Sequence, residues 1–465
     1  MFNANTYIHR RAQLVNTVKT GVLLLLGNGE SPMNYTDNSY HFRQDSTFLY
    51  YFGINAPNLA AIIDVEENSI TVFGDEMTID EIVWMGRQET LWEKCQKAGV
   101  AQTLPSADLQ NFISKAKAQN RPIHYLPPYR GDNKIKLTEL LGVSPSVLAA
   151  GASVPFIKAV IAQRAIKTPE EIVEIEKAVN ITGAMHLLAM QIAKPDLTEN
   201  DVAAAIHKVA LEGGGNLAFP IIMTTRGEIL HNHYHGNTLK EGQLLLNDSG
   251  AETAMGYAGD MSRTLPVGKT FSAQQREIYS ISLSAHEAAI ARLKPGTRYL
   301  DVHYTACKTI AQGLKEIGLM KGDIDEAVAV GAHALFFQCG TGHMMGLDVH
   351  DMEDLGEQYV GYTDALRKNT TQFGLKSLRL GRELEAGFVL TIEPGIYFIP
   401  ELIDMWKAEN RFAQFINYEK VEAWKYFGGL RAEEDFLITE TGCQLLGKPI
   451  AKTIADIEAV RAAAF

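Results

Sequence analysis

The sequence predicts an α+β protein of two domains, a smaller α/β domain over residues 1–165 and a larger domain over residues 166–465. Three observations support this fold class. Strand-like and helical runs alternate through the first part of the chain, and a strong helix start comes after residue 167. In the second part, two pairs of short motifs recur in the same order, which indicates a domain built from two related halves.

The first domain begins with short apolar runs that are typical of strands. We expect strands over residues 22–26, 60–65 and 70–73, and helices over residues 88–98 and 108–118. No cluster of acidic residues and histidines stands out in this part of the chain. The candidate functional residues all lie in the second domain.

The second domain opens with a helix-start signature. Thr168-Pro169-Glu170-Glu171 has the composition of a capping box with proline at the first helical position. Apolar residues come next at helical spacing, so a long helix is expected. Thr198 with Asp201, and Ser272 with Gln275, predict two further helix starts in the same way.

The two pairs of recurring motifs connect the halves of this domain. Lys194-Pro195 precedes Asp201-Val202 at the spacing with which Lys294-Pro295 precedes Asp301-Val302. The segments 242–250 and 387–395 are both apolar strands that end in an acid, one further residue and a glycine. Each half therefore presents a carboxylate at the end of a strand.

Composition limits the class of function. Lys and Arg number 43 against 55 Asp and Glu, a net charge of −12, which argues against a nucleic-acid partner. The 4 cysteines show no CxxC spacing, so neither a disulfide scaffold nor a structural zinc site is expected. No signal peptide or membrane-spanning run is visible, and we expect a cytoplasmic protein without a membrane partner.

Four carboxylates and one histidine form the candidate site. Asp248 and Asp260 lie twelve residues apart with three glycines between them, which suits adjacent strands with both carboxylates on one face. Turn-forming aspartates are the alternative. Glu393 ends the matching strand, Glu433 precedes another strand, and His343 comes directly after a glycine-rich turn.

These carboxylates would repel one another if they met in a core, and divalent cations remove that repulsion. A donor set of four carboxylates and one imidazole is rich in oxygen. It suits Mn²⁺, Co²⁺ or Fe²⁺, and Zn²⁺ can also be accommodated. Several carboxylates with few neutral donors are typical of two ions that share bridging ligands.

The motifs around these residues resemble those of the pita-bread metallopeptidases, which include aminopeptidase P, prolidase and methionine aminopeptidase. The resemblance covers nearly the whole chain. Residues 257–264 (YAGDMSRT) and 391–397 (TIEPGIY) are similar to the proline-directed branch. Residues 42–46 (FRQDS) resemble the creatinase-type N-terminal domain, which methionine aminopeptidases lack.

The resemblance implies a creatinase/aminopeptidase P-like N-terminal domain over 1–165. It implies a pita-bread catalytic domain with an internal pseudo-twofold repeat over 166–465. It also implies that two divalent ions, with Mn²⁺ favoured, are bound by Asp248, Asp260, His343, Glu393 and Glu433. Homodimers or homotetramers are usual in the family.

The resemblance further implies roles for residues around the metals. His231 and His350 would flank the substrate and stabilise the tetrahedral intermediate or position the proline carbonyl. Glu393 would be catalytic as well as a metal ligand, and would move the proton to the leaving proline nitrogen. Arg431 and Tyr397 would support the metal carboxylates from behind.

The resemblance predicts hydrolysis of the Xaa-Pro bond in peptides with proline at the second position. Arg379 is similar to the prolidase arginine that binds the free carboxylate of a dipeptide, which suits its planar fork. A solvated loop charge is the other interpretation of Arg379. The insertion 398–428 also favours an Xaa-Pro dipeptidase. The alternative is an Xaa-Pro aminopeptidase that acts on longer peptides.

One position departs from the family pattern. Cys339 stands where the family usually has a histidine that contacts substrate, which puts substrate binding or rate in question while leaving the metal ligands intact. His233 and His235 are expected to be surface histidines. A metal-free binding module of the same fold and a metal-independent amidinohydrolase like creatinase are the remaining alternatives, and the complete ligand set argues against both.

Overall fold

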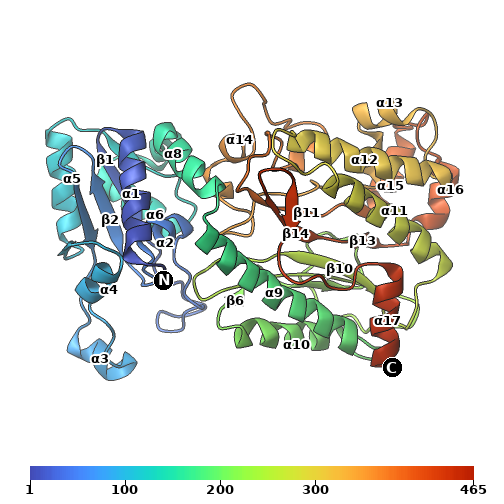
Figure 1. The fold of residues 1–465 in the computed structure, drawn as a ribbon, viewed down its shortest axis with the longest axis horizontal. Helices are drawn as coiled ribbons and strands as arrows, with labels where there is room; N and C mark the ends of the chain where they lie inside the picture. The colour runs from blue at the N-terminus through green and yellow to red at the C-terminus, as the bar shows by residue number, and fades with distance from the viewer. The chain divides into compact units, whose positions relative to one another are not determined.

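The structure, a computed structural model, describes all residues 1–465. They form two compact units (Figure 1). One unit comprises Met1–Arg164 with Met352–Tyr359, and the other comprises Ala165–Asp351 with Val360–Phe465.

The first unit is built on a five-stranded mixed sheet of order β4-β3-β2-β1-β5. β1 pairs antiparallel with β2 and parallel with β5, while β3 pairs antiparallel with β2 and parallel with β4. The strands are β1 (Val22–Leu26), β2 (Ala60–Asp64), β3 (Ser69–Phe73), β4 (Gln102–Leu104) and β5 (Ile123–Tyr125). The helices are α1 (Ala4–Val18), α2 (Ser46–Phe52), α3 (Ile79–Met85), α4 (Leu91–Lys97), α5 (Asp108–Ala118), α6 (Gly131–Leu141), α7 (Pro145–Ala150) and α8 (Val154–Ala165).

The expected strands and helices of this unit are present. β1 and α5 have the predicted bounds, and β2 and β3 differ from prediction by one residue at one end. The helix expected over 88–98 covers only Leu91–Lys97, because Thr90 and Glu93 form a capping box that sets its start.

After residue 165 the chain forms four small sheets, of orders β10-β8-β7, β11-β14-β15, β12-β13 and β6-β9. Their strands are β6 (Asn216–Leu217), β7 (Ile222–Thr224), β8 (Leu244–Ser249), β9 (Ala251–Glu252), β10 (Met261–Pro266), β11 (Val389–Ile392), β12 (Gly395–Tyr397), β13 (Gly429–Arg431), β14 (Glu434–Ile438) and β15 (Cys443–Leu445). The helices are α9 (Pro169–Ile192), α10 (Glu199–Glu212), α11 (Ala273–Ile290), α12 (Tyr299–Glu316), α13 (Ile324–Ala329), α14 (Glu357–Val360), α15 (Pro400–Ala408), α16 (Tyr418–Val421) and α17 (Ile454–Ala464). Four 3-10 turns, η1 (Ala332–Leu335), η2 (Glu353–Leu355), η3 (Leu375–Ser377) and η4 (Glu422–Trp424), complete the chain.

The second unit has matching halves, as the recurring motifs predict. In the first half α9 packs on α10 and on the strands β8 and β10, and in the second half α11 packs on α12 and on β11 and β12 (Figure 1). The predicted helix starts are confirmed, because Thr168, Thr198 and Ser272 are the N-caps of α9, α10 and α11, each in a complete capping box.

β10, in the first half of the unit, makes several polar contacts with the second half. The backbone N–H of Glu433 donates to the carbonyl of Ser262 at 3.0 Å. The buried guanidinium of Arg263 donates to the carbonyl of Glu433 at 2.7 Å and to the carboxylate of Glu434 at 2.8 Å. These bonds bring the strand ends of the first half against those of the second. No helix has both the length and the apolar character needed to cross a membrane.

Candidate active site

A cavity of about 490 Å³ lies in the second unit, and its wall is rich in charged and polar side chains. All eight residues predicted to bind metal or substrate line it: Asp248, Asp260, His343, Glu393, Glu433, His231, His350 and Arg379. Arg431 lines the cavity as well, while Tyr397 lies behind it and is fully buried. The structure therefore brings the residues selected from sequence into one place.

The first two carboxylates come from neighbouring strands. β8 and β10 pair antiparallel with Asp248 opposite Ser262, and Asp260 directly precedes β10, so both aspartates lie at the same end of the pair. Near that end of the strand pair, the backbone at Gly250 lies close to the backbone at Gly259. A Cβ on Gly250 would lie 2.0 Å from the carbonyl oxygen of Gly259, so only glycine is tolerated at this close approach.

The other donors come from the second half of the unit. Glu393 directly succeeds β11, and Glu433 lies between β13 and β14. His343 lies in the preceding loop, with Nε2 3.4 Å from Oδ2 of Asp260 and 3.4 Å from Oε1 of Glu393. Donor atoms of Asp260, His343 and Glu433 all lie within 4.8 Å of one another.

The carboxylates destabilise one another in this setting. Burial, together with repulsion from Asp248, raises the pKa of Asp260 to about 8. Burial and the neighbouring acids also raise the pKa of Glu433 well above its ordinary value. The pKa of Glu393 is raised in the same direction, chiefly by burial, although its side chain keeps 19% of its surface exposed toward the cavity. Metal-free, the site therefore holds protons that a cation would displace.

The donors fit a divalent cation. Nδ1 of His343 lies 3.0 Å from the carbonyl oxygen of Met344, and donation from Nδ1 leaves the lone pair of Nε2 facing the carboxylates. A lone pair and two carboxylates that face one another attract a cation. Oδ1 of Asp260 is also buried with no hydrogen-bond partner.

Arg431 contacts a predicted ligand directly, and Tyr397 contacts Arg431. Arg431 ion-pairs with Asp248, donates from Nη1 to the hydroxyl of Tyr397 at 2.6 Å, and donates from Nε to Ser262 at 2.9 Å. Burial alone would lower the pKa of Arg431, but Tyr397 and the surrounding acids raise it above its ordinary value. Arg431 therefore stays charged and offsets part of the negative charge.

Three residues that hold the site were missed from sequence. The hydroxyl of Ser262 donates a hydrogen bond to Oε2 of Glu433 at 2.7 Å. The hydroxyl of Thr391 accepts a hydrogen bond from the backbone N–H of His343 at 3.2 Å. The carboxylate of Asp435 accepts one from the backbone N–H of Asp260 at 3.1 Å. Each of the three lies two residues along the chain from a predicted metal ligand: Ser262 from Asp260, Thr391 from Glu393 and Asp435 from Glu433. Since side chains two apart share a face of a strand, that spacing is the signal that could have found them.

The remaining predicted residues, His231, His350 and Arg379, also line the cavity. The ring of His350 packs edge-on against that of His343, with centroids 4.4 Å apart. Burial and then the charge of Arg431 lower the pKa of His231, so this ring is neutral at pH 7. His233 is exposed as expected, and it also lines the cavity.

Cys339 lies in this cavity at the position where the family pattern has histidine. Its Sγ is 4.0 Å from the hydroxyl of Tyr397. Burial and the nearby Glu393 raise the pKa of its thiol to about 12. A neutral thiol of this kind cannot exchange a proton near pH 7 as an imidazole does.

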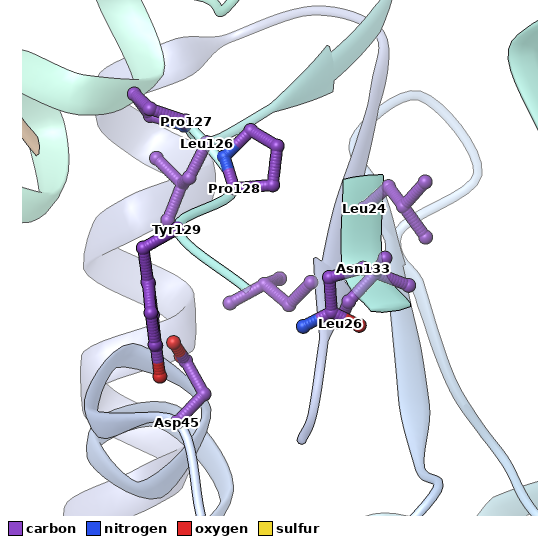
Figure 2. Close-up of a pocket in the computed structure, with 9 residues that line it drawn as sticks. Leu24, Leu26, Asp45, Leu126, Pro127, Pro128, Tyr129 and Asn133 are labelled. Atoms are coloured by element: carbon purple, nitrogen blue, oxygen red, sulfur yellow. The ribbon is translucent and has the colours of Figure 1, made fainter. Parts of the chain in front are cut away.

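The first unit has a much smaller cavity of about 50 Å³ near the ends of β1 and β5 (Figure 2). Leucines and prolines form most of its wall, and Asp45 is its only acid. The Asp45 side chain also accepts the backbone N–H of Phe48 at 2.8 Å and so caps α2. This cavity lacks the clustered titratable groups of the larger one.

Comparison with known proteins extends the likeness over the whole chain. The Xaa-Pro aminopeptidase of Escherichia coli K12 is 29% identical over 466 residues, which cover 98% of this chain and 97% of the relative. The Xaa-Pro dipeptidase of Homo sapiens is also 29% identical, over 459 residues, 96% of this chain and 90% of the relative.

Solved structures give the same result for the fold. The aminopeptidase PepP of Pseudomonas aeruginosa superposes with a TM-score of 0.81 at 26% identity, covering 100% of this chain and 99% of that one. Zinc-substituted E. coli aminopeptidase P in complex with product superposes with a TM-score of 0.80 at 28% identity and the same coverage.

Family models match both parts of the chain. Residues 7–124 match the aminopeptidase P N-terminal domain. Residues 173–440, more than half of the chain, match metallopeptidase family M24. The two-domain fold, the family match and the full-length relatives agree, and the chain belongs to metallopeptidase family M24 as a hydrolase with an aminopeptidase P-type N-terminal domain.

Proposed function

We propose that the protein hydrolyses the Xaa-Pro peptide bond, with dipeptides as the preferred substrates. The preference for dipeptides is best supported by the position of Arg379, which lines the same cavity as the predicted metal ligands and His231. The free carboxylate of a short peptide needs a cation at a fixed distance from the reacting bond, and Arg379 offers one.

In this proposal two divalent ions are held by Asp248, Asp260, His343, Glu393 and Glu433, with Mn²⁺ favoured and Co²⁺, Fe²⁺ or Zn²⁺ possible. The ions supply Lewis acidity, which polarises the scissile carbonyl and acidifies water. The support is the donor chemistry, together with the buried Oδ1 of Asp260 that has no other partner.

The chain's own residues move protons and hold the substrate. A water adds to the carbonyl carbon before proline, and Glu393 accepts its proton and returns it to the proline nitrogen as that bond breaks. His231 and His350 donate hydrogen bonds to the carbonyl oxygen as charge develops on it.

Proline recognition is assigned to an apolar part of the wall that the sequence could not identify. Phe219, Leu230 and Val349 line the cavity beside the two histidines. The nitrogen of an Xaa-Pro peptide bond carries no hydrogen and cannot donate a hydrogen bond to the enzyme. The pyrrolidine ring therefore has to be recognised by apolar contact.

An Xaa-Pro aminopeptidase is the second candidate, because relatives of both activities are equally similar to this chain. The substrates of the two activities differ in the group on the carboxyl side of proline. A dipeptide places a carboxylate there, which Arg379 can bind with two parallel hydrogen bonds. A longer peptide places a neutral amide there.

The test compares proline release from an Xaa-Pro dipeptide with cleavage of an Xaa-Pro-Xaa tripeptide by the Mn²⁺-loaded protein. We expect the dipeptide to be preferred, and Arg379→Ala to lower its kcat/KM by about 10–100-fold while sparing the tripeptide. Arg382→Ala is the matched control, since Arg382 forms an exposed ion pair with Glu385. Preference for the tripeptide that is indifferent to Arg379 supports the aminopeptidase instead.

Metal analysis of the same preparation tests the remaining alternative. A binding module of this fold would contain no divalent metal and cleave neither peptide. On the family resemblance, we also propose that the protein is cytoplasmic and forms a homodimer or homotetramer. Sedimentation of the purified protein measures the oligomeric state.

A further inference from the structure

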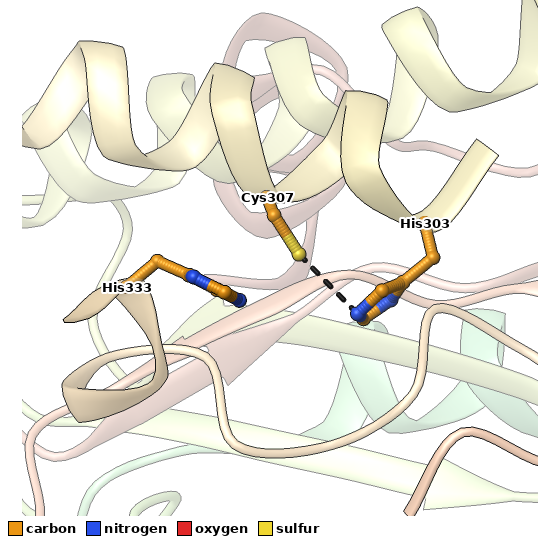
Figure 3. Close-up of side chains that lie close together, drawn as sticks. All are labelled: His303, Cys307 and His333. Carbon is orange, nitrogen blue, oxygen red and sulfur yellow. Dashed lines mark hydrogen bonds between the residues drawn. The ribbon is translucent and has the colours of Figure 1, made fainter. Parts of the chain in front are cut away.

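A second cluster of metal-binding side chains lies in the same unit but outside the active-site cavity. His303 and Cys307 project from one face of α12 toward His333 on η1 (Figure 3). All three side chains are buried, and their donor atoms lie within 4.8 Å of one another. None of the three lines the large cavity.

The helix aligns the first two donors. Residues four apart on an α-helix share a face, so His303 and Cys307 point the same way. Sγ of Cys307 lies 3.4 Å from Nε2 of His303, and Nδ1 of His303 lies 2.8 Å from Oγ1 of Thr341. Donation from Nδ1 to Thr341 leaves a lone pair on Nε2 beside the sulfur, which is how metal-binding histidines are oriented.

His333 provides an independent observation. Neither of its ring nitrogens has a hydrogen-bond partner, although the ring is buried. Burying such a group without a partner costs free energy, so unsatisfied buried nitrogens are rare in folded proteins. Burial also lowers the pKa of His303 to about 3 and that of His333 to about 4, so both rings are neutral at pH 7.

We propose that His303, Cys307 and His333 bind a thiophilic d¹⁰ ion, Zn²⁺ or Cu⁺, at a site separate from the active-site cavity. One thiolate and two imidazoles are softer donors than the carboxylates of the cavity, and they select these ions over Mn²⁺. Binding displaces the proton of the Cys307 thiol, which leaves as H⁺ to the solvent.

The spacing of the donors is compatible with such an ion. Separations of 3.4 to 4.8 Å enclose a point roughly 2.0–2.8 Å from each donor, close to the Zn–N and Zn–S lengths of about 2.0 and 2.3 Å. Cysteine spacing could not have revealed the site, because it uses one cysteine and two histidines from different segments.

The site is connected to the active-site loop through Thr341. The carbonyl of Thr341 accepts the backbone N–H of Glu393 at 2.7 Å, and Thr341 lies two residues before His343. An ion bound to His303 would hold the ring that contacts Thr341. We therefore assign the ion a structural role, in which it stabilises this loop and takes no part in the reaction.

The experiment uses Co²⁺ as the probe, because a thiolate–Co²⁺ bond gives a charge-transfer absorption in the near ultraviolet that carboxylate and imidazole ligands do not give. The full chain is produced with Co²⁺ in the medium, since the buried donors are loaded as the chain folds. The purified protein is then dialysed against a chelator to empty the open cavity. We expect wild type to keep about one Co²⁺ per chain together with the thiolate band.

Variants locate the sulfur. Cys307→Ser is expected to lose the band and at least ten-fold of the retained cobalt. Cys339→Ser is the matched control and is expected to keep both, because its sulfur lies in the active-site cavity. Absence of the band from wild type overturns the proposal, as does a band that depends on Cys339 and survives in Cys307→Ser.

A second variant covers the case in which Cys307→Ser does not fold. His333→Gln leaves the sulfur in place, and we expect it to retain at least ten-fold less cobalt than wild type after chelation. Equal retention by His333→Gln and wild type overturns the proposal. Metal analysis of protein from medium containing both zinc and copper then tells which ion is bound.

Discussion

Nε2 of His343 faces Oδ2 of Asp260 at 3.4 Å, while Nδ1 of the same ring lies 3.0 Å from the carbonyl oxygen of Met344. The ring is therefore oriented so that the lone pair of Nε2 points at the carboxyl group of Asp260. A cation that displaces the proton of Asp260 would find two ligands here, the imidazole Nε2 and a carboxylate oxygen.

Addition of metal is accordingly expected to stabilise the protein. At a metal concentration one hundred times the Kd, the free energy of unfolding should rise by about 2.7 kcal/mol. Urea unfolding with chelator and with Mn²⁺ measures the difference. Asp260→Asn should remove the metal dependence, whereas Asp301→Asn, which alters an exposed ion pair with Arg298, should keep it. Identical unfolding curves for wild type in both buffers would contradict the site.

Metal affinity is expected to depend on pH. In the metal-free protein the pKa of Asp260 is raised to about 8, so below that pH an ion has to displace a proton. The apparent affinity should rise by about tenfold per pH unit up to pH 8 and then level off. Titration calorimetry in buffers of different ionisation enthalpy counts the released protons. Affinity that is constant from pH 6 to 8 speaks against a proton on Asp260.

The stability of the metal-free protein should change in the opposite sense to that affinity. Folded Asp260 keeps its proton up to about pH 8, whereas the unfolded carboxyl loses it near pH 4, so the folded state binds more protons in this window. The free energy of unfolding contributed by this group is present at pH 4 and is lost as pH rises toward 8. Asp260→Asn, which cannot titrate, should remove this part of the pH dependence.

Glu393→Gln is expected to lower kcat by about 10²–10⁴-fold, because an amide cannot carry the proton. The fold should survive, since the backbone N–H of Glu393, which donates to Thr341 at 2.7 Å, is unchanged. Proline release and thermal unfolding are measured together. Glu385→Gln, an exposed position, is the control. Turnover that equals wild type would remove Glu393 from the proposed mechanism.

Arg431→Met should destabilise the metal-free protein by about 3–5 kcal/mol, because it leaves buried carboxylates without their cation. Arg431→Lys should cost less, since it restores the charge but not the three-way contact with Asp248, Ser262 and Tyr397. Saturating metal should reduce both losses. Urea unfolding with and without Mn²⁺ gives the comparison, and a Met variant as stable as wild type would show that the ion pair contributes little.

Sequence patterns predicted the parts of the fold that local chemistry determines. Thr168, Thr198 and Ser272 start helices because side chain and backbone satisfy each other within four residues, which needs no tertiary information. Thr90 with Glu93 is the same signature, and it corrects the helix expected from residue 88.

Only the site residues that belong to a recognisable sequence motif could be predicted. Asp248 and Glu393 end similar strands, so their role as a pair was visible from sequence. The partners Ser262, Thr391 and Asp435 carry no motif of their own, and their function depends on which strand packs opposite. His333 comes near the other two donors of its cluster only through the fold, and it could not be paired with Cys307 beforehand.

The join between the two halves also has a consequence for folding kinetics. The bonds from Arg431 to Asp248, from Ser262 to Glu433 and from Asp260 to Asp435 span 183, 171 and 175 residues. Loops of that length close late, because their entropic cost has to be met before the contacts form. The carboxylates are therefore still dispersed while the helix pairs of each half assemble. We therefore expect metal binding at this site to follow the assembly of the two halves and not to nucleate folding.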